Sequence, residues 1–242
     1  MKNISIFAFF LSAINSYGTF SATIAAGANH SLFLDTEGNV WATGVNTYSQ
    51  LGLGDKVSRQ IPTKIENIPH IKALAAGHHY SLLLDEEGNV WTIGNNFSGQ
   101  LGLGDKVSRQ IPTKIENITH IKALAAGHHY SLLLDEEGNV WTIGNNFSGE
   151  LGLGDTDDRD VPTKIENIPT IKAVAAGYDY SLLLDEEGNV CAAGDNTDDQ
   201  LGLGDNVHKV NVPTRIYTLP PIQLPMPEKA KIPTKSARNI VE

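Results

Sequence analysis

Two pairs of adjacent histidines are the residues of this chain whose type and spacing most invite chemistry. His78-His79 and His128-His129 stand fifty residues apart, and imidazole is the commonest metal ligand in proteins. Adjacent histidines on an extended segment point apart, so one pair chelates poorly. Two pairs on neighbouring structural units could share an ion if both leaned toward a common axis. Solvated loop histidines are the more ordinary interpretation, and we predict no metal site.

Clustered carboxylates are the second such feature. Residues 155–160 and 195–199 supply oxygen ligands for calcium, but they lack the glycine and final glutamate of the twelve-residue calcium loop. Asp85-Glu86-Glu87 could pair carboxylates for acid–base catalysis, but a glycine follows and the segment is typical of a tight surface turn. No Gly-rich phosphate loop, nucleophile elbow or Ser/His/Asp order is present. We predict no catalytic residue and no cofactor, with nucleotide exchange on a GTPase as the one activity left open.

A fifty-residue unit, written four times in register, must position these groups. Leu-Gly-Leu-Gly-Asp begins at positions 51, 101, 151 and 201, and Ala-Ala-Gly begins at positions 25, 75, 125 and 175. Units 51–100 and 101–150 differ only where Pro69 and Gln100 become Thr119 and Glu150. A period of this length indicates a module that must stack on its copies to bury its apolar face. Function is therefore expected on a surface built from equivalent loops.

Each unit is predicted to form four short antiparallel strands. In the second unit, charged and apolar residues alternate over 64–68, which predicts an exposed edge strand. The apolar run 71–76 predicts a buried inner strand, and 80–84 and 90–93 form a hairpin around a glycine-containing turn. Four such strands, repeated radially, make a β-propeller blade. No apolar period of about 3.6 residues supports a helical solenoid, and a β-solenoid, the structural alternative, usually has shorter coils.

The two ends of the chain bear on ring closure and domain organisation. The first unit lacks an edge strand and a spare one lies at 212–216. We therefore predict a ring of four four-stranded blades, closed by pairing of this C-terminal edge strand with the first unit. Residues 1–22 have the layout of a secretory signal peptide, and a divergent N-terminal segment is the alternative. The propeller is predicted over 23–219, followed by a Pro-rich, basic and disordered tail over 220–242.

The charge distribution favours a protein partner over nucleic acid or membrane. The formal net charge is −10, and unit 151–200 alone carries twelve acidic and three basic residues. Binding to nucleic acid or to anionic lipid requires clustered lysine and arginine. We expect no nucleic acid and, after signal removal, no membrane. If residues 1–18 are a signal peptide the protein is secreted or periplasmic, and the alternative is the cytoplasm.

The repeat resembles that of the regulator of chromosome condensation family. In the first unit the resemblance is carried by residues 25–34 (AAGANHSLFL), 37–44 (EGNVWATG) and 50–54 (QLGLG), and it recurs in all four units over 23–218. The resemblance implies a propeller, usually of seven blades, that binds through loops on one face. It also implies a choice among exchange factors for Ran-type small GTPases, interaction modules, and secreted propellers that inhibit enzymes such as β-lactamases. No residue here can be matched to the protruding wedge on which the exchange activity depends.

Four units are fewer than the family's usual ring holds, so the ring is smaller, open, or completed by a second copy in a homodimer. Strand direction places the 77–79 and 94–100 loops on one face and the 67–70 and 85–89 turns on the other. Aromatic and amide side chains on loops are typical of a protein-binding surface, and acidic residues attract a basic partner. We predict a non-enzymatic propeller that binds a protein through the first face, with a small GTPase or an inhibited enzyme as alternative partners. The predicted partner-binding residues are Asn29, His30, His78, His79, Asn95, Asn96, Phe97, His128, His129, Asn145, Asn146, Phe147, Tyr178, Asp179, Asp195, Asp198 and Asp199.

Overall fold

The computed structural model describes residues 23–204 and 207–222. All the regular secondary structure in those ranges is β-strand. Within them there is accordingly no helix that could span a bilayer. The predicted signal peptide and residues 223–242 of the predicted tail lie outside the described residues.

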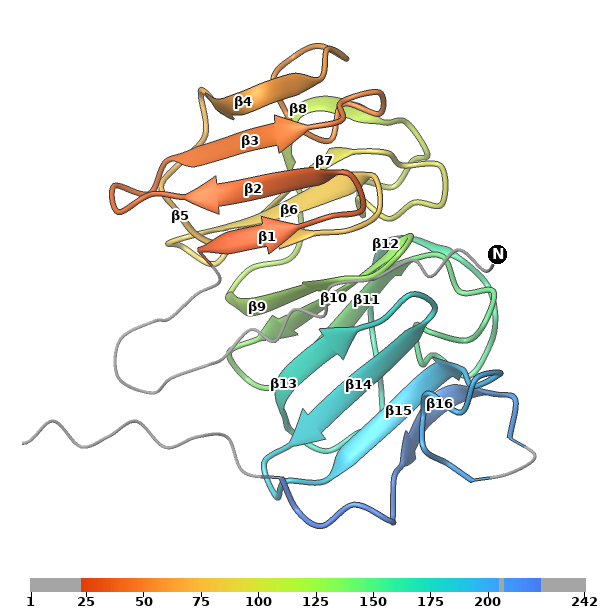
Figure 1. The fold of residues 1–242 in the computed structure, drawn as a ribbon. Helices are drawn as coiled ribbons and strands as arrows, with labels where there is room; N and C mark the ends of the chain where they lie inside the picture. The colour runs from red at the N-terminus through yellow and green to blue at the C-terminus, as the bar shows by residue number, and fades with distance from the viewer. Residues whose placement is uncertain (1–22, 205–206, 223–242) are drawn as a thin grey trace, which may run out of the picture.

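The strands form four antiparallel sheets, each of four strands, which we call blades 1 to 4 (Figure 1). Blade 1 holds β1 (Ile24–Ala26), β2 (His30–Leu34), β3 (Val40–Gly44) and β4 (Arg59–Lys64). Blade 2 holds β5 (Ile71–Ala76), β6 (Tyr80–Asp85), β7 (Val90–Gly94) and β8 (Arg109–Lys114). Blade 3 holds β9 (Ile121–Ala126), β10 (Tyr130–Asp135), β11 (Val140–Gly144) and β12 (Arg159–Lys164). Blade 4 holds β13 (Ile171–Ala176), β14 (Tyr180–Asp185), β15 (Val190–Asp195) and β16 (Lys209–Arg215).

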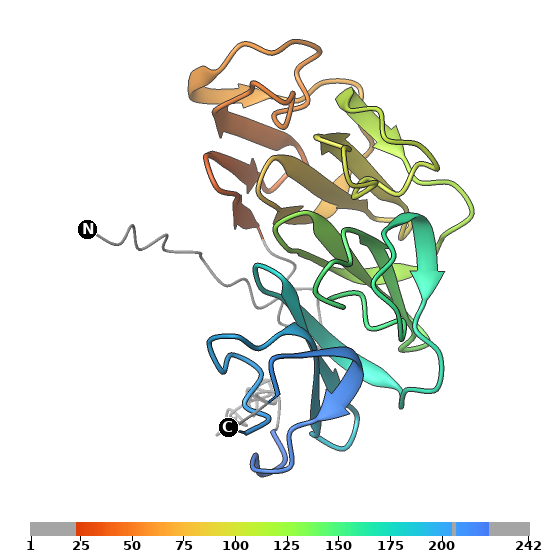
Figure 2. The same ribbon diagram turned by 90° about the vertical axis from the view of Figure 1, so that its right-hand side faces the viewer.

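The four blades fan out in chain order along an arc (Figure 2). Their first strands, β1, β5, β9 and β13, contact one another in sequence and line the inner side of the arc. These strands are rich in alanine, which lets neighbouring blades approach closely near the axis, and the apolar cores form between one blade and the next. The predicted all-β propeller architecture, with four four-stranded antiparallel blades, is confirmed.

The outer strand of each blade lies earlier in the repeat than predicted. β4 spans Arg59–Lys64 and is largely exposed, as an edge strand should be, but it ends where the predicted strand 64–68 begins. The chain turns here because Ile65 is buried, its N–H bonded to the carbonyl of Val40, and because Asn67 adopts a φ of 59°. The alternation that suggested a strand therefore belongs to a turn with one inward side chain.

Each blade takes its outermost strand from the following unit. β4 belongs to the second unit by sequence, yet Lys64 pairs with Trp41 of β3. In the same way β16 pairs with β15, opposing Arg215 to Cys191, and completes blade 4. This corrects the predicted pairing of strand 212–216 with the first unit, because β4 already occupies that edge. Contact between blades 1 and 4 would have to involve their flanks, and closure of the ring stays a prediction.

Tyrosines at one repeated position link each blade to the next. The hydroxyl of fully buried Tyr80 donates to the carbonyl of Tyr130, and the Tyr130 hydroxyl donates to the carbonyl of Tyr180. In blade 1 the position holds His30, whose Nε2 lies 3.0 Å from Oγ of Ser81. Burial, with smaller contributions from two other histidines, lowers the pKa of His30 to about 4. His30 is therefore a neutral ring that takes the place of the tyrosine.

Position along the arc changes the burial of identical sequences. The segment Tyr-Ser-Leu-Leu-Leu-Asp is buried throughout in β6 and β10. In β14 the same six residues alternate, with Tyr180, Leu182 and Leu184 only half-buried. These three side chains lie on the flank that faces a following blade in blades 2 and 3, and no described blade follows blade 4. The flank of blade 4 is therefore an apolar surface without its usual cover from a described blade.

Candidate protein-binding face

Two sets of loops lie together at one end of the blades. The short turns join the first and second strands of each blade, and the long loops follow each third strand. The N–H of Asn95 donates to the carbonyl of His79 over 2.9 Å, so the two sets adjoin as strand direction predicted. We call this end the loop face; it comprises residues 27–29, 77–79, 127–129 and 177–179 with residues 45–50, 95–100, 145–150 and 195–200.

A continuous series of rings crosses the loop face from blade 1 to blade 4. Tyr48, from the long loop of blade 1, stacks on His79 with ring centres 4.5 Å apart. His79 contacts His78 at 3.8 Å, and His78 contacts His128 of the next blade at 4.4 Å. His128 in turn stacks on Tyr178 of blade 4 at 3.8 Å. This ring series connects all four blades at the level of their short turns.

The sequence suggested that the two histidines of each pair point apart, and the structure shows that they do not. The ring centres of His128 and His129 lie 3.9 Å apart, and those of His78 and His79 are equally close. The reason is that the segment is a tight turn, closed in blade 2 by a bond from the N–H of Gly77 to the carbonyl of Tyr80. A sharp turn brings consecutive side chains to the same side, whereas an extended strand separates them.

Four histidines of the loop face are neutral at neutral pH. They are His78, His79, His128 and His129, and we call them the ring cluster. Burial is the largest cause of a lowered pKa at each of them, and neighbouring imidazoles add to the effect at three. The pKa of His79 falls to about 4 and that of His128 to about 3. The cluster therefore presents uncharged rings with nitrogen lone pairs, without positive charge.

Aromatic side chains project from the loop face. Phe97 is 66% exposed, Phe147 is 79% exposed and Tyr178 is 41% exposed. Sequence analysis missed Tyr48, which meets Phe97 edge to face at 6.3 Å. The signal was its aromatic type in the same long loop, one position after the equivalent of Phe97. Of the other predicted residues, Asn29, Asp198 and Asp199 are exposed, and His78, His79, His128, His129, Asn145, Asp179 and Asp195 are half-buried.

Four of the predicted contact residues are buried, so they cannot meet a partner: His30, Asn95, Asn96 and Asn146. Asn96 shapes its loop, because its Nδ2 donates to the carbonyl of Asp105 over 2.8 Å and its Oδ1 accepts the N–H of Leu101 over 2.9 Å. Asn146 makes the same two kinds of contact in blade 3. These amides hold the long loops in shape and do not themselves form part of the exposed surface.

Asn96→Ala is expected to lower stability by about 1–3 kcal/mol, since the buried N–H of Leu101 would lose its acceptor. Phe97→Ser, at the next position, should leave stability within about 0.5 kcal/mol because its ring is mostly exposed. Urea denaturation of both variants measures the difference. A larger loss for the Phe97 variant would contradict these assignments.

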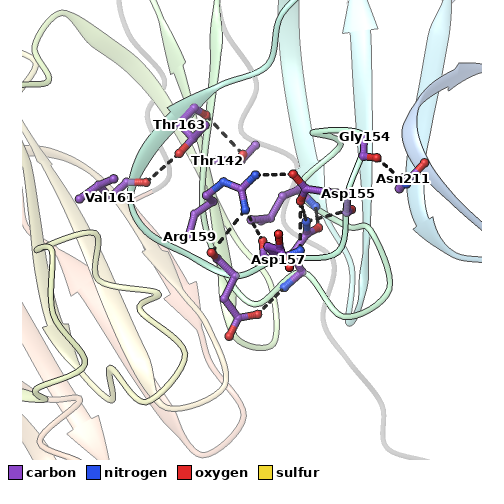
Figure 3. A network of polar contacts seen from close by, with 11 residues as sticks. Thr142, Gly154, Asp155, Asp157, Arg159, Val161, Thr163 and Asn211 are labelled. Atoms are coloured by element: carbon purple, nitrogen blue, oxygen red, sulfur yellow. Dashed lines mark hydrogen bonds and ion pairs between the residues drawn. The ribbon is translucent and has the colours of Figure 1, made fainter.

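Acidic residues gather on the blade 3 and blade 4 side of the loop face. Asp179 is half-buried, and burial followed by the nearby charge of Asp195 raises the pKa of its carboxyl group. Asp155, in the acidic run 155–160, is paired with Arg159. Arg159 donates to Oδ2 of Asp155 over 2.6 Å and to the carbonyl of Asp157 over 2.6 Å (Figure 3). That ion pair stabilises the loop that leads into β12. We call Asp179, Asp195, Asp198 and Asp199 the acidic sector of the loop face.

A buried carboxyl group lies beneath the acidic sector. Glu150 is fully buried; its Oε2 accepts the N–H of Ser148 over 2.8 Å, and its Oε1 has no hydrogen-bond partner among the described residues. Burial is the main cause that raises the pKa of Glu150 to about 7, and the charges of Asp179 and Asp158 add to it. Gln100 fills the same position in blade 2. The sequence shows this difference between near-identical units, but only the burial of Glu150 shows that the difference shifts a pKa.

The carboxylates on the opposite end of the blades are structural, as predicted for the turn. Asp85 is buried; its Oδ1 accepts the N–H of Asn89 over 2.8 Å and its Oδ2 accepts Nε1 of Trp91 over 3.0 Å. The same arrangement joins Asp135 to Trp141 over 3.1 Å. Both oxygens of each aspartate are thus engaged in closing a hairpin.

Comparison with known proteins gives two family matches. The model described as the regulator of chromosome condensation (RCC1) repeat matches residues 37–84, 87–134, 137–184 and 187–224. A second model of the same repeat matches residues 22–50, 71–100 and 171–200. A search of curated proteins finds no significant match.

Solved structures with the same arrangement of blades include yeast and human proteins. Prp20p of Saccharomyces cerevisiae, described with its binding to Gsp1p and histones, is 30% identical with a TM-score of 0.71, over 80% of this chain and 49% of that one. Yeast RCC1 (Prp20), solved with Kap60 bound, matches at 30% identity and a TM-score of 0.71, over 82% and 50%. Human WBSCR16, at 24% identity, a TM-score of 0.71 and coverage of 79% and 50%, supports the fold alone. The chain spans about half the length of these relatives.

Proposed function

Because the chain belongs to the regulator of chromosome condensation repeat family, we propose that it is a non-enzymatic propeller that binds a protein partner through its loop face. The observation that carries the proposal is the exposure of Phe97, Phe147 and Tyr178 on braced loops. Exposed aromatic rings on a rigid scaffold bury much apolar area at little cost in conformational entropy, which is how interface anchors work.

The acidic sector indicates the charge that a partner should carry. Asp198 and Asp199 are exposed on blade 4, beside half-buried Asp179 and Asp195. A field of one sign steers and orients a partner of the opposite sign. The partner is therefore proposed to present a basic surface next to an apolar one.

A binding experiment with defined probes tests this proposal. The probes are purified core histones and a Ran-type GTPase, chosen because Prp20p is described with its binding to Gsp1p and histones. We expect the double variant Phe97→Ser/Phe147→Ser to weaken binding of whichever probe binds by roughly 30-fold, the loss of one interface hot spot or more. The matched control is Ile61→Ser/Ile111→Ser, which removes equally exposed apolar side chains from β4 and β8. Loss of binding in the control variant alone, or no binding by either probe, would count against the loop face.

Nucleotide exchange is the principal alternative function, and a second assay separates it. If catalytic amounts of the chain speed release of labelled GDP from the GTPase, the protein is an exchange factor rather than a simple binder. Binding without faster release supports the proposal. Inhibition of a secreted enzyme such as a β-lactamase is the second alternative, and it is tested by titrating the chain against that enzyme's turnover.

As the alternative to closure within one chain, we propose that a second copy covers the flanks of blades 1 and 4. Phe33 in blade 1 is half-buried, whereas leucines 83, 133 and 183 at the equivalent position are buried. At the other end, Tyr180 and Leu182 are half-buried where their counterparts are fully buried. Light scattering in solution tests this part on its own: twice the chain mass supports a homodimer, and the mass of one chain overturns it.

Export is proposed on the sequence of residues 1–18, with the cytoplasm as the alternative. Sequencing the N-terminus of the protein made by its own host decides between them. A new N-terminus near residue 18 supports export, and retention of Met1 contradicts it.

A further inference from the structure

Three histidines from two blades converge on the loop face. His78, His128 and His129 each offer one ring nitrogen, and these three nitrogens all lie within 4.8 Å of one another. Their backbones are held together as well, since the N–H of His78 donates to the carbonyl of His128 over 3.3 Å. The convergence is thus built into the junction between blades 2 and 3.

Part of this cluster lacks partners. Nδ1 of His78 is buried and has no hydrogen-bond partner among the described residues, and the same is true of Nδ1 of His79. Buried polar atoms in folded proteins are nearly always bonded, so an orphaned one needs an explanation. Ring stacking covers the faces of these imidazoles and gives Nδ1, which lies in the ring plane, no hydrogen bond. An ion bound in the ring plane would engage such a nitrogen.

We propose that His78, His128 and His129 bind one divalent transition-metal ion of the kind that prefers imidazole, such as Zn²⁺. This inference goes beyond partner binding and does not depend on it. Neutral imidazoles are ligands for zinc, copper and nickel, and three protein ligands leave an open position. In a tetrahedral zinc site, ligand nitrogens at 2.0–2.1 Å from the metal lie about 3.4 Å apart. Small rotations of the rings therefore close the cluster onto an ion.

A neighbouring carboxylate suits such a site. Oδ1 of Asp179 lies 3.9 Å from Nδ1 of His128, close enough to serve as a fourth ligand or to orient the ring. A carboxylate that accepts the second ring N–H fixes the orientation of a metal-binding histidine.

The proposed stoichiometry follows from the repeat. Blade 1 has Ala28-Asn29 at the positions of the histidine pair, and blade 4 has Tyr178-Asp179. Only the junction of blades 2 and 3 therefore brings two histidine pairs together in the described structure. One ion is expected for each chain.

Calorimetric titration of the untagged chain with ZnCl₂ tests the site. We expect one ion per chain, and we expect His78→Gln and His128→Gln each to weaken binding by more than the roughly 10–100-fold that a change outside the ligand set costs. The control is His70→Gln/His120→Gln, which removes two exposed histidines from the opposite turns. It should bind Zn²⁺ like the unchanged chain.

A spectroscopic measurement keeps the test independent of variant folding. Co²⁺ added to the unchanged chain should give the intense visible bands of a tetrahedral nitrogen site, and one equivalent of Zn²⁺ should abolish them. The proposal is overturned if no such bands appear, if Zn²⁺ binds equally well to folded His128→Gln, or if the control variant alone loses binding. In each of those cases the histidines are a ring stack and nothing more.

Discussion

Tyr80→Ala is expected to lower the free energy of unfolding by about 3–5 kcal/mol, in the range of large-to-small changes at fully buried aromatic positions. Tyr80 has no exposed surface and packs in the core between blades 2 and 3. Its hydroxyl also donates to the carbonyl of Tyr130 and accepts a bond from Ser131 over 3.1 Å. The variant loses apolar burial, opens a cavity at a blade junction and removes both of these hydrogen bonds.

The repeat supplies a matched control for this prediction. Tyr180→Ala changes the same residue within the same six-residue segment, but Tyr180 is half-buried and no described blade follows it. Its loss should be well under half that of Tyr80→Ala. Tyr80→Phe separates the hydroxyl from the ring and should cost about 1 kcal/mol. Urea denaturation followed by tryptophan fluorescence measures all three. Equal losses at positions 80 and 180 would show that the blades do not share a core.

Glu150→Gln is expected to stabilise the protein by about 3 kcal/mol at pH 8 and to have almost no effect at pH 4. The pKa of Glu150 is raised to about 7 in the folded chain, from 4.5 in a free side chain. Below pH 4.5 both states hold the proton and the shift contributes nothing. Between pH 4.5 and 7 the unfolded chain ionises while the folded chain does not, so stability falls as the pH rises. Above pH 7 the full cost is present.

We expect glutamine to fit at position 150 because Gln100, the equivalent residue of blade 2, is already a glutamine with bonded amide atoms. Nε2 of Gln100 donates to Oδ1 of Asn95 over 3.0 Å, and its Oε1 accepts the N–H of Ser98 over 2.9 Å. In Glu150→Gln, the new amide can make both bonds within blade 3. The reverse change, Gln100→Glu, should destabilise the protein over the same pH range. Unfolding curves for both variants from pH 4 to 8 provide the measurement, and pH-independent differences would contradict the buried charge.

Most of the blade could be predicted from the sequence. The apolar run 71–76 and the hairpin strands 80–84 and 90–93 are β5, β6 and β7 to within one residue at each end. These predictions succeeded because a strand that is buried on one or both faces has a clear apolar pattern in its sequence. The outer strand failed because an exposed strand has little such pattern, and the alternation at 64–68 reflects one buried isoleucine, Ile65.

The site could be predicted only as a face. Loop positions follow from strand direction, so the gathering of the 77–79 and 94–100 loops was foreseeable. Side-chain direction was not: Asn96 and Phe97 are neighbours in sequence, yet one is fully buried and the other is mostly exposed. Tyr48 and Glu150 acquire their roles from neighbouring blades. A single sequence does not state which copy of a unit will lie beside which.

The offset between unit and blade has a consequence for the gene. Because each sheet is finished by a strand from the next copy, a genetic crossover within the near-identical stretches 51–100 and 101–150 removes or inserts one whole copy and leaves no sheet short of a strand. After such a deletion, β7 would be followed by the sequence of β12, which differs from β8 at two of six residues. The arc can thus lengthen or shorten during evolution in steps of one whole blade.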